Sequence, residues 1–121
     1  MLAQNIDRRA WNLDLLSRVG IATKVEAMPL AVYFPRGNKS EFTMAMLGWG
    51  SFSGDLALRS LVATEQPAKG FGTWNWSKYS NPKVDALVSK APTELNAEKR
   101  IAMYREAQNI VVDEAPYILF Y

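Results

Sequence analysis

The sequence predicts an α/β fold in which a small mixed sheet with one βαβ unit is flanked by helices. Residues 42–47 are almost continuously apolar, which is typical of a strand buried on both faces of a parallel sheet. Residues 21–27 carry β-permissive side chains around Val25 and form a second candidate strand. Between them, Pro29 opens a helical segment that Pro35 and the following Gly-Asn-Lys-Ser run end. This strand–helix–strand order is that of a right-handed βαβ unit.

Helices are predicted on both sides of this unit. An N-terminal helix ends at a C-cap provided by Gly20, and its apolar positions recur at helical spacing at Ala3, Ile6, Ala10 and Leu13. Asp55 is expected to cap a helix over residues 56–63.

The second half of the chain carries stronger helix signals. Asn81 followed by Pro82 is an N-cap residue followed by proline at the first helical position, and this helix ends near residues 91–92. The last helix starts near Asn96 and stops before Ala115, with an apolar stripe of Ala97, Ile101, Tyr104 and Val111. Residues 117–121 are expected to form a final strand.

Composition excludes several functions. The 121 residues fit one domain, and a net charge of +2 is too small to argue for a nucleic-acid partner. The chain has no His and no Cys, so it has no imidazole or thiolate with which to hold a metal or form a nucleophilic site. Ser51 and Ser53 have no histidine base. A site built from carboxylates alone stays open, for glycoside chemistry or a hard cation. The sequence supplies no carboxylate or Lys pair mapped to a closed cleft, so we expect no enzymatic activity and no cofactor.

A candidate binding site lies where the apolar run ends at Gly48-Trp49-Gly50. Ligands bind at the carboxyl ends of strands in open α/β sheets, and an indole offers a flat apolar wall. Trp49 either forms that wall or closes the top of the core, and Phe52 either stacks on a ligand or packs beneath its loop. For Asp55, helix capping is favoured over ligand contact.

An aromatic loop, residues 71–79, is the second candidate surface. It contains Trp74, Trp76 and Tyr79 around Asn75. These rings either pin the loop to the body or contact a partner. The alternative function is therefore a stand-alone α/β protein-interaction module that uses this loop.

The order of these motifs resembles the carboxy-terminal lobe of family 5 extracellular solute-binding proteins, the peptide-, dipeptide- and nickel-type binding components of ABC importers. The resemblance covers nearly the whole chain and rests on the motifs Phe42-x-Met44-x-Met46-x-Gly48-Trp49, Asp55, Asn75-x-x-x-Tyr79-Ser80-Asn81-Pro82-x-x-Asp85, Lys99-Arg100-x-x-x-Tyr104-x-x-Ala107-Gln108 and Asp113-x-Ala115-Pro116-Tyr117-Ile118.

The resemblance implies that residues 1–121 are a single fragment of the second lobe, with residues 117–121 leading back to the hinge. In the periplasm, the whole protein would capture a peptide-like or other small solute between two lobes and deliver it to a permease of the membrane. The signal peptide would lie outside this fragment. The implied solute-binding residues are Trp49, Gly50, Ser51 and Phe52, and Asn75 completes the predicted set.

One position departs from the family pattern. Peptide-binding members carry an Asp three residues after the Trp, where it pairs with the α-amino group of the ligand, and here that position is Phe52. Without this carboxylate, an uncharged, sugar-like, modified or apolar solute is favoured over a free peptide N-terminus.

The apolar end of the chain, Tyr-Ile-Leu-Phe-Tyr, indicates a truncated sequence. An incomplete lobe exposes a strand edge that invites pairing with a second copy. We therefore expect the isolated fragment to self-associate.

Overall fold

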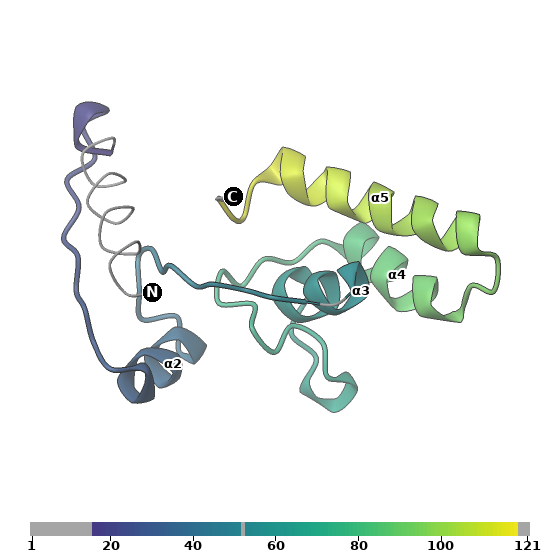
Figure 1. Cartoon of the computed structure of the whole chain (residues 1–121), viewed down its shortest axis with the longest axis horizontal. Coiled ribbons are helices and arrows are strands. Elements are labelled where there is room, and N and C mark those ends of the chain that lie inside the picture. The colour runs from purple at the N-terminus through teal and green to yellow at the C-terminus, as the bar shows by residue number, and fades with distance from the viewer. Residues whose placement is uncertain (1–15, 52, 119–121) are drawn as a thin grey trace.

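The computed structural model describes residues 16–51 and 53–118 as helices joined by loops and extended segments. No β-strand occurs within those two ranges, so the prediction of an α/β fold with a small mixed sheet and a βαβ unit is wrong. Figure 1 shows helices α3, α4 and α5 gathered in one body, with α2 set apart from them. Within the same ranges, no helix is both long and apolar enough to cross a membrane.

The two candidate strands, residues 21–27 and 42–47, lack secondary-structure pairing. A strand needs a neighbour to satisfy its backbone N–H and C=O groups, and the described part of the chain places none beside either segment. The Met46 carbonyl instead accepts a hydrogen bond from the Tyr33 hydroxyl at 2.8 Å. The side chains of Met44 and Met46 are exposed. The apolar run therefore lies on the surface.

Helix α2 (Leu30–Asn38) begins after Pro29, as predicted, but continues past Pro35. The helix ends one turn later than the sequence suggests. Its end is set by Ser40, which adopts a left-handed conformation (φ 54°) and whose N–H donates to the Gly37 carbonyl at 2.8 Å.

The predicted C-cap at Gly20 is confirmed. Gly20 has φ 82°, and its N–H donates to the Ser17 carbonyl at 3.0 Å. The Ile21 N–H donates to the Leu16 carbonyl at 3.0 Å, which completes the Schellman pattern of a helix end. The rest of the predicted N-terminal helix lies outside the described residues, as do residues 119–121 of the predicted final strand.

Helix α3 (Gly54–Ala57) begins two residues earlier than predicted. The N-cap is Ser53, whose hydroxyl accepts from the Leu56 N–H at 3.3 Å, so the prediction that Asp55 caps this helix is wrong. Serine and aspartate are comparable caps, and the sequence alone does not rank two of them so close together. The helix continues as a π-helical turn, η1 (Leu58–Val62), closed by a hydrogen bond from the Ala63 N–H to the Leu58 carbonyl.

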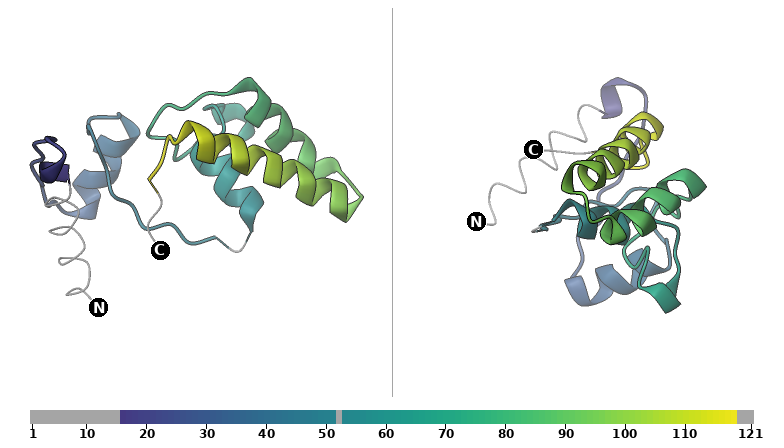
Figure 2. Two further views of the ribbon diagram at one scale, coloured as in Figure 1. Left: turned by 90° about the horizontal axis from the view of Figure 1, so that it is seen from above. Right: turned by 90° about the vertical axis from the view of Figure 1, so that its right-hand side faces the viewer.

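The predicted helices of the second half are confirmed. Asn81 caps α4 (Pro82–Lys90), and its Oδ1 accepts from the N–H groups of Lys83 at 2.9 Å and Val84 at 3.2 Å. A short 3₁₀ turn, η3 (Ala91–Thr93), follows. Asn96 then caps α5 (Ala97–Glu114), which ends where Ala115 turns left-handed. Figure 2 shows α4 and α5 side by side.

The core is small and lies between η1, α4 and α5. Its buried side chains are Val62, Val84, Val88 and Ala107. Only the Ala107 side of α5 is buried, whereas Ile101, from the predicted stripe, is about half exposed. With so little apolar burial, the hydrogen bonds around the core are needed to fix its geometry.

The carbonyl groups at the end of the α3–η1 helix accept hydrogen bonds from other segments of the chain. The carbonyl of Arg59 accepts from the Gly72 N–H at 2.9 Å and that of Ser60 from the Trp74 N–H at 3.0 Å. The Leu61 carbonyl accepts from the Tyr117 hydroxyl at 2.6 Å. Helix ends leave such carbonyls without intrahelical partners. Here they fix both the following loop and the start of the C-terminal segment.

A second set of polar contacts joins the two ends of the α4–α5 hairpin. The Glu114 carboxylate accepts from the Tyr79 hydroxyl at 2.5 Å and from Asn81 Nδ2 at 2.9 Å. Asn81 thus caps α4 with its oxygen and holds α5 with its nitrogen. Asp85 accepts from the N–H and the hydroxyl of Thr64 at 2.8 and 2.5 Å, which fixes the segment that leaves η1.

Helix α2 is attached to the rest of the chain through Trp76. The indole N–H of Trp76 donates to Asn38 Oδ1 at 2.9 Å, and its ring covers Gly37 so closely that a Cβ there would lie 2.5 Å from a ring carbon. The Ser40 hydroxyl donates to the Trp76 carbonyl at 3.0 Å. Glycine at position 37 is therefore required by the close approach of the indole.

Substitution Gly37→Ala tests this attachment. Ala normally stabilises a helix interior by about 1 kcal/mol relative to Gly, but here the new methyl group collides with the indole. We expect a net loss of about 1–3 kcal/mol in the free energy of unfolding, typical of overpacking. Urea unfolding followed by tryptophan fluorescence measures it. Gly48→Ala, whose Cβ would meet nothing within 4 Å, is the matched control. A stabilised Gly37→Ala variant would contradict the attachment.

The Glu114 contacts predict losses of stability at both ends of the pH scale. Hydrogen bonds from Tyr79 and Asn81 lower the pKa of Glu114 below 4.5. Its stabilisation is therefore present above pH 4.5 and is lost as pH falls through the folded-state pKa. Burial, followed by the hydrogen bond to Glu114, raises the pKa of Tyr79 from 10.0 to about 12. The stabilisation from its neutral phenol is present below pH 10 and is lost as pH rises towards 12.

Urea midpoints measured across the pH range test these two groups separately. We expect Glu114→Gln to flatten the acid side of the profile, and Tyr79→Phe to flatten the alkaline side. Glu98→Gln, an exposed acid in the first turn of the same helix, is the charge-matched control. Unchanged profiles in both test variants would show that the contacts do not form in solution.

Candidate functional site

Six aromatic side chains from three parts of the chain form one cluster, called here the aromatic cluster. The ring centroids of adjacent members lie 5.1–6.1 Å apart, mostly edge to face, which is the favoured geometry of aromatic pairs. The members come from α2, from the segment that follows it and from the loop before α4: Tyr33, Phe34, Phe42, Trp49, Trp74 and Trp76.

Trp49 is the exposed end of the aromatic cluster. About a third of its surface is open, at 36%. Its ring meets Trp74 at 5.9 Å with an interplanar angle of 61°. A Cβ on either flanking glycine, Gly48 or Gly50, would meet nothing within 4 Å. Trp49 is therefore not buried over the core, and no residue of the described ranges fills the positions beside its two flanking glycines.

Ser51 and Ser53 form a small turn beside Trp49. The Ser51 hydroxyl donates to the Ser53 carbonyl at 2.7 Å and accepts from the Ser53 N–H at 3.3 Å. Gly50 and Ser51 are exposed next to the indole, whereas Phe52 lies outside the described residues.

Asn75 is placed differently from the other predicted binding residues, because its side chain is buried and fully engaged. Its Nδ2 donates to the carbonyls of Ala63 at 3.0 Å and Tyr79 at 2.7 Å. Its Oδ1 accepts from the Ser77 hydroxyl at 2.9 Å and the Tyr79 N–H at 3.1 Å. These four bonds shape the aromatic loop, so the contact of Asn75 with a ligand stays a prediction with no free donor or acceptor to support it.

Gly72 explains how the loop reaches the helix end. It has φ 65°, and a Cβ there would lie 2.6 Å from the Ala63 carbonyl oxygen. Only glycine permits this approach. Together with Asn75, it carries Trp74 into the aromatic cluster.

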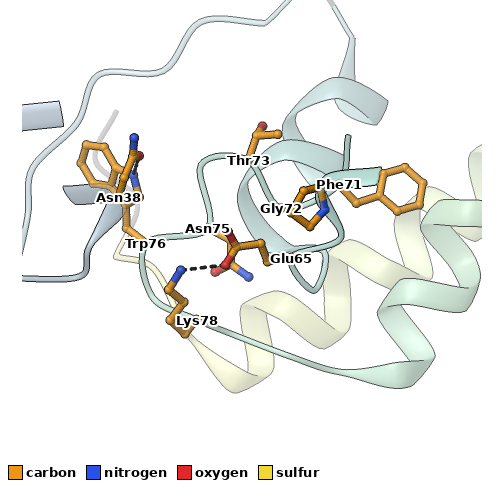
Figure 3. A pocket seen from close by; sticks show the side chains of 9 residues that line it. Asn38, Glu65, Phe71, Gly72, Thr73, Asn75, Trp76 and Lys78 are labelled. Atoms are coloured by element: carbon orange, nitrogen blue, oxygen red, sulfur yellow. Dashed lines mark hydrogen bonds and ion pairs between the residues drawn. The ribbon is translucent and has the colours of Figure 1, made fainter. Parts of the chain in front are cut away.

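A pocket of about 250 Å³ is lined mainly by residues of the segment 65–78. Figure 3 shows Trp76 and Asn38 on one side of it and the Lys78–Glu65 ion pair, at 2.8 Å, near its centre. Both charged side chains are half exposed. Such a pair adds at most about 1 kcal/mol to stability. Most of the lining residues belong to the aromatic loop predicted as a candidate surface, whereas Asn38, Glu65 and Pro67 lie outside that predicted range.

Asp55 faces other helices of the body. Its carboxylate accepts from the Tyr104 hydroxyl at 3.0 Å and pairs with Arg59 at 3.3 Å. Burial, followed by this hydrogen bond, raises the pKa of the Tyr104 phenol. Asp55 therefore joins α3 to α5.

The chain is similar to several curated binding proteins. It is 28% identical over 102 residues to heme-binding protein A of Haemophilus influenzae, covering 84% of the chain and 18% of the relative. It is 32% identical over 111 residues to glutathione-binding protein GsiB of Salmonella paratyphi A, covering 85% of the chain and 21% of the relative. Its homologues are periplasmic solute-binding proteins of the family 5 type. The resemblance to family 5 solute-binding proteins that the sequence motifs predict is thereby confirmed.

The dipeptide-binding protein of Escherichia coli is a further homologue, 27% identical over 108 residues that make up 85% of the chain. The chain spans about a fifth of the length of these relatives. They are binding proteins and not enzymes, in agreement with the expectation of no catalytic activity. No family model and no solved structure matches the chain.

Substitution Asn75→Asp tests the buried amide. The change replaces a donor of two hydrogen bonds with an oxygen that faces two carbonyls. We expect a loss of about 1–3 kcal/mol in the free energy of unfolding, the cost of unsatisfied buried groups. Asn38→Asp is the matched control, because that exposed side chain accepts from Trp76 and an aspartate accepts equally well. Equal stability of the two variants in urea would argue against the four-bond arrangement.

Proposed function

We propose that this chain is part of the solute-binding component of an ABC importer, which captures a peptide-like or other small solute between two lobes and delivers it to a permease. The observation that supports the proposal is the match of about five-sixths of the chain to proteins that bind heme, dipeptides and glutathione. One relative is itself called a periplasmic protein. We accordingly propose a periplasmic location, and that residues 1–121 belong to the second lobe.

Within this function, Trp49, Gly50 and Ser51 are the proposed ligand-contacting residues. The indole of Trp49 supplies an apolar wall, and the open space around Gly50 lets a solute approach the backbone. Phe52 completes the proposed set from its place in the sequence. Asn75 supports the site by holding the loop that carries Trp74.

The proposed solute is not recognised through a free α-amino group. Residues 42–54 contain no ionisable side chain, so an ammonium group beside Trp49 would find no carboxylate within this segment. An unpaired ammonium is costly to take out of water. An uncharged, modified or apolar part of the solute suits this surface better.

The alternative, an interaction module that uses residues 71–79, has less support. Trp74 and Trp76 are turned into the aromatic cluster and are not presented to a partner. The exposed methionines of the extended segment do support the expectation that the isolated chain self-associates.

The decisive experiment uses the protein encoded by the complete reading frame that contains this sequence. Its thermal unfolding is measured with alanyl-phenylalanine, the N-acetylated form of the same dipeptide, glutathione and hemin. We expect at least one ligand to raise the melting temperature, since a ligand at about 100 times its Kd adds about 2.7 kcal/mol. The N-acetylated dipeptide is expected to match or exceed the free dipeptide, and Trp49→Ala is expected to reduce the effect.

Leu95→Ala is the control variant, because Leu95 is an exposed apolar side chain in the turn before α5. The absence of any shift with all four compounds would contradict the proposal for this solute range. A strong preference for the free dipeptide would retain the binding function but overturn the proposed solute class.

A further inference from the structure

Trp49 touches the rest of the aromatic cluster through a single ring. Among the described residues, Trp74 is its aromatic neighbour, at 5.9 Å and 61°. An edge-to-face contact of this kind restrains an indole while leaving much of its surface free. The orientation of Trp49 therefore depends on Trp74.

Trp74 is itself fixed from two directions. Its backbone N–H donates to the Ser60 carbonyl at 3.0 Å at the end of η1. Its ring lies 5.5 Å from Phe34 of α2 and 6.1 Å from Trp76. The helical body and α2 thus both hold the ring on which Trp49 rests.

The chemistry around Trp49 selects a flat and uncharged group. The open positions at Gly48 and Gly50 leave room beside the indole, and residues 42–54 offer no charge to pair with. The face of an indole is electron-rich and attracts planar conjugated rings by stacking. We propose that Trp74 is a positioning residue that holds Trp49 as a stacking platform for a planar, uncharged part of the solute.

The role of this platform in binding a transported solute rests on the proposed function. The arrangement of Trp74 and Trp49 is a property of this chain alone and is tested without a transporter. Removing Trp74 would free the Trp49 side chain, which must then be ordered again on binding. Ordering one side chain lowers affinity by about two- to tenfold.

The test uses the 121-residue chain and caffeine, a neutral planar molecule, as the probe. The contribution of Trp49 to fluorescence is obtained by subtracting the spectrum of Trp49→Phe. We expect caffeine to quench this contribution through a ground-state complex. We expect Trp74→Ala to weaken the association about two- to tenfold, and Trp74→Phe, which retains a ring edge, to restore most of it. Acrylamide, which quenches by collision, reports accessibility separately.

A second measurement does not depend on the stability of Trp74→Ala. Two indoles at 5.9 Å couple electronically, and Trp74 also couples with Trp76 at 6.1 Å. The wild-type circular dichroism should therefore contain an exciton couplet that Trp49→Phe reduces and Trp74→Phe removes. An unchanged couplet in either variant would overturn the geometry. Equal caffeine association in wild type and Trp74→Ala would overturn the positioning role.

These outcomes are separable from those of the solute screen. Caffeine stacking that depends on Trp74, together with no solute binding by the whole protein, would leave the platform in place and reject the transport function. Solute binding by the whole protein, together with no effect of Trp74→Ala on caffeine association, would retain the transport function and reject the platform.

Discussion

The carbonyl groups at the end of the α3–η1 helix impose the constraint on which the rest of the structure depends. The carbonyls of residues 59, 60, 61 and 63 accept hydrogen bonds from Gly72, Trp74, Tyr117 and Asn75, respectively. These donors come from the loop before α4 and from the segment after α5, so one helix end organises parts of the chain that are far apart in sequence. The π turn belongs to the same arrangement, because its wider winding alters which carbonyls are used within the helix.

This constraint connects the small core to the candidate site. The four buried core residues lie in the α3–α5 body, whereas Trp49 lies on the segment that leads away from α2. The loop over residues 72–76 lies between them, bonded to the helix end on one side and packed against α2 through Trp74 and Trp76 on the other. The proposed binding surface is thereby supported by the helical body, whose buried core residues are not among the proposed ligand contacts.

The sequence predicted the ends of helices well, but it predicted contacts between distant segments of the chain poorly. Asn81-Pro82, Asn96 and Gly20 mark helix ends because each cap is a contact between near neighbours in the chain. The strand prediction at residues 42–47 failed because apolar character shows that a segment avoids water but does not supply the neighbour that a strand requires. Asn75 was singled out, but its four hydrogen bonds depend on partners brought together by the loop. The pairing of Glu114 with Tyr79 spans 35 residues and left no local signal.

The attachment of α2 through two indoles, Trp74 and Trp76, has a consequence for how the chain opens. Segments held by few buried contacts open with a smaller free energy than the cooperative core. Loss of the Trp74 and Trp76 contacts would release α2 while α4 and α5 stay packed. Backbone amides of α2 would then exchange with solvent deuterium long before those of Val84 or Ala107, and a protease would cut first in the extended segment between α2 and α3. The α4–α5 hairpin would then stay folded while α2 opens separately.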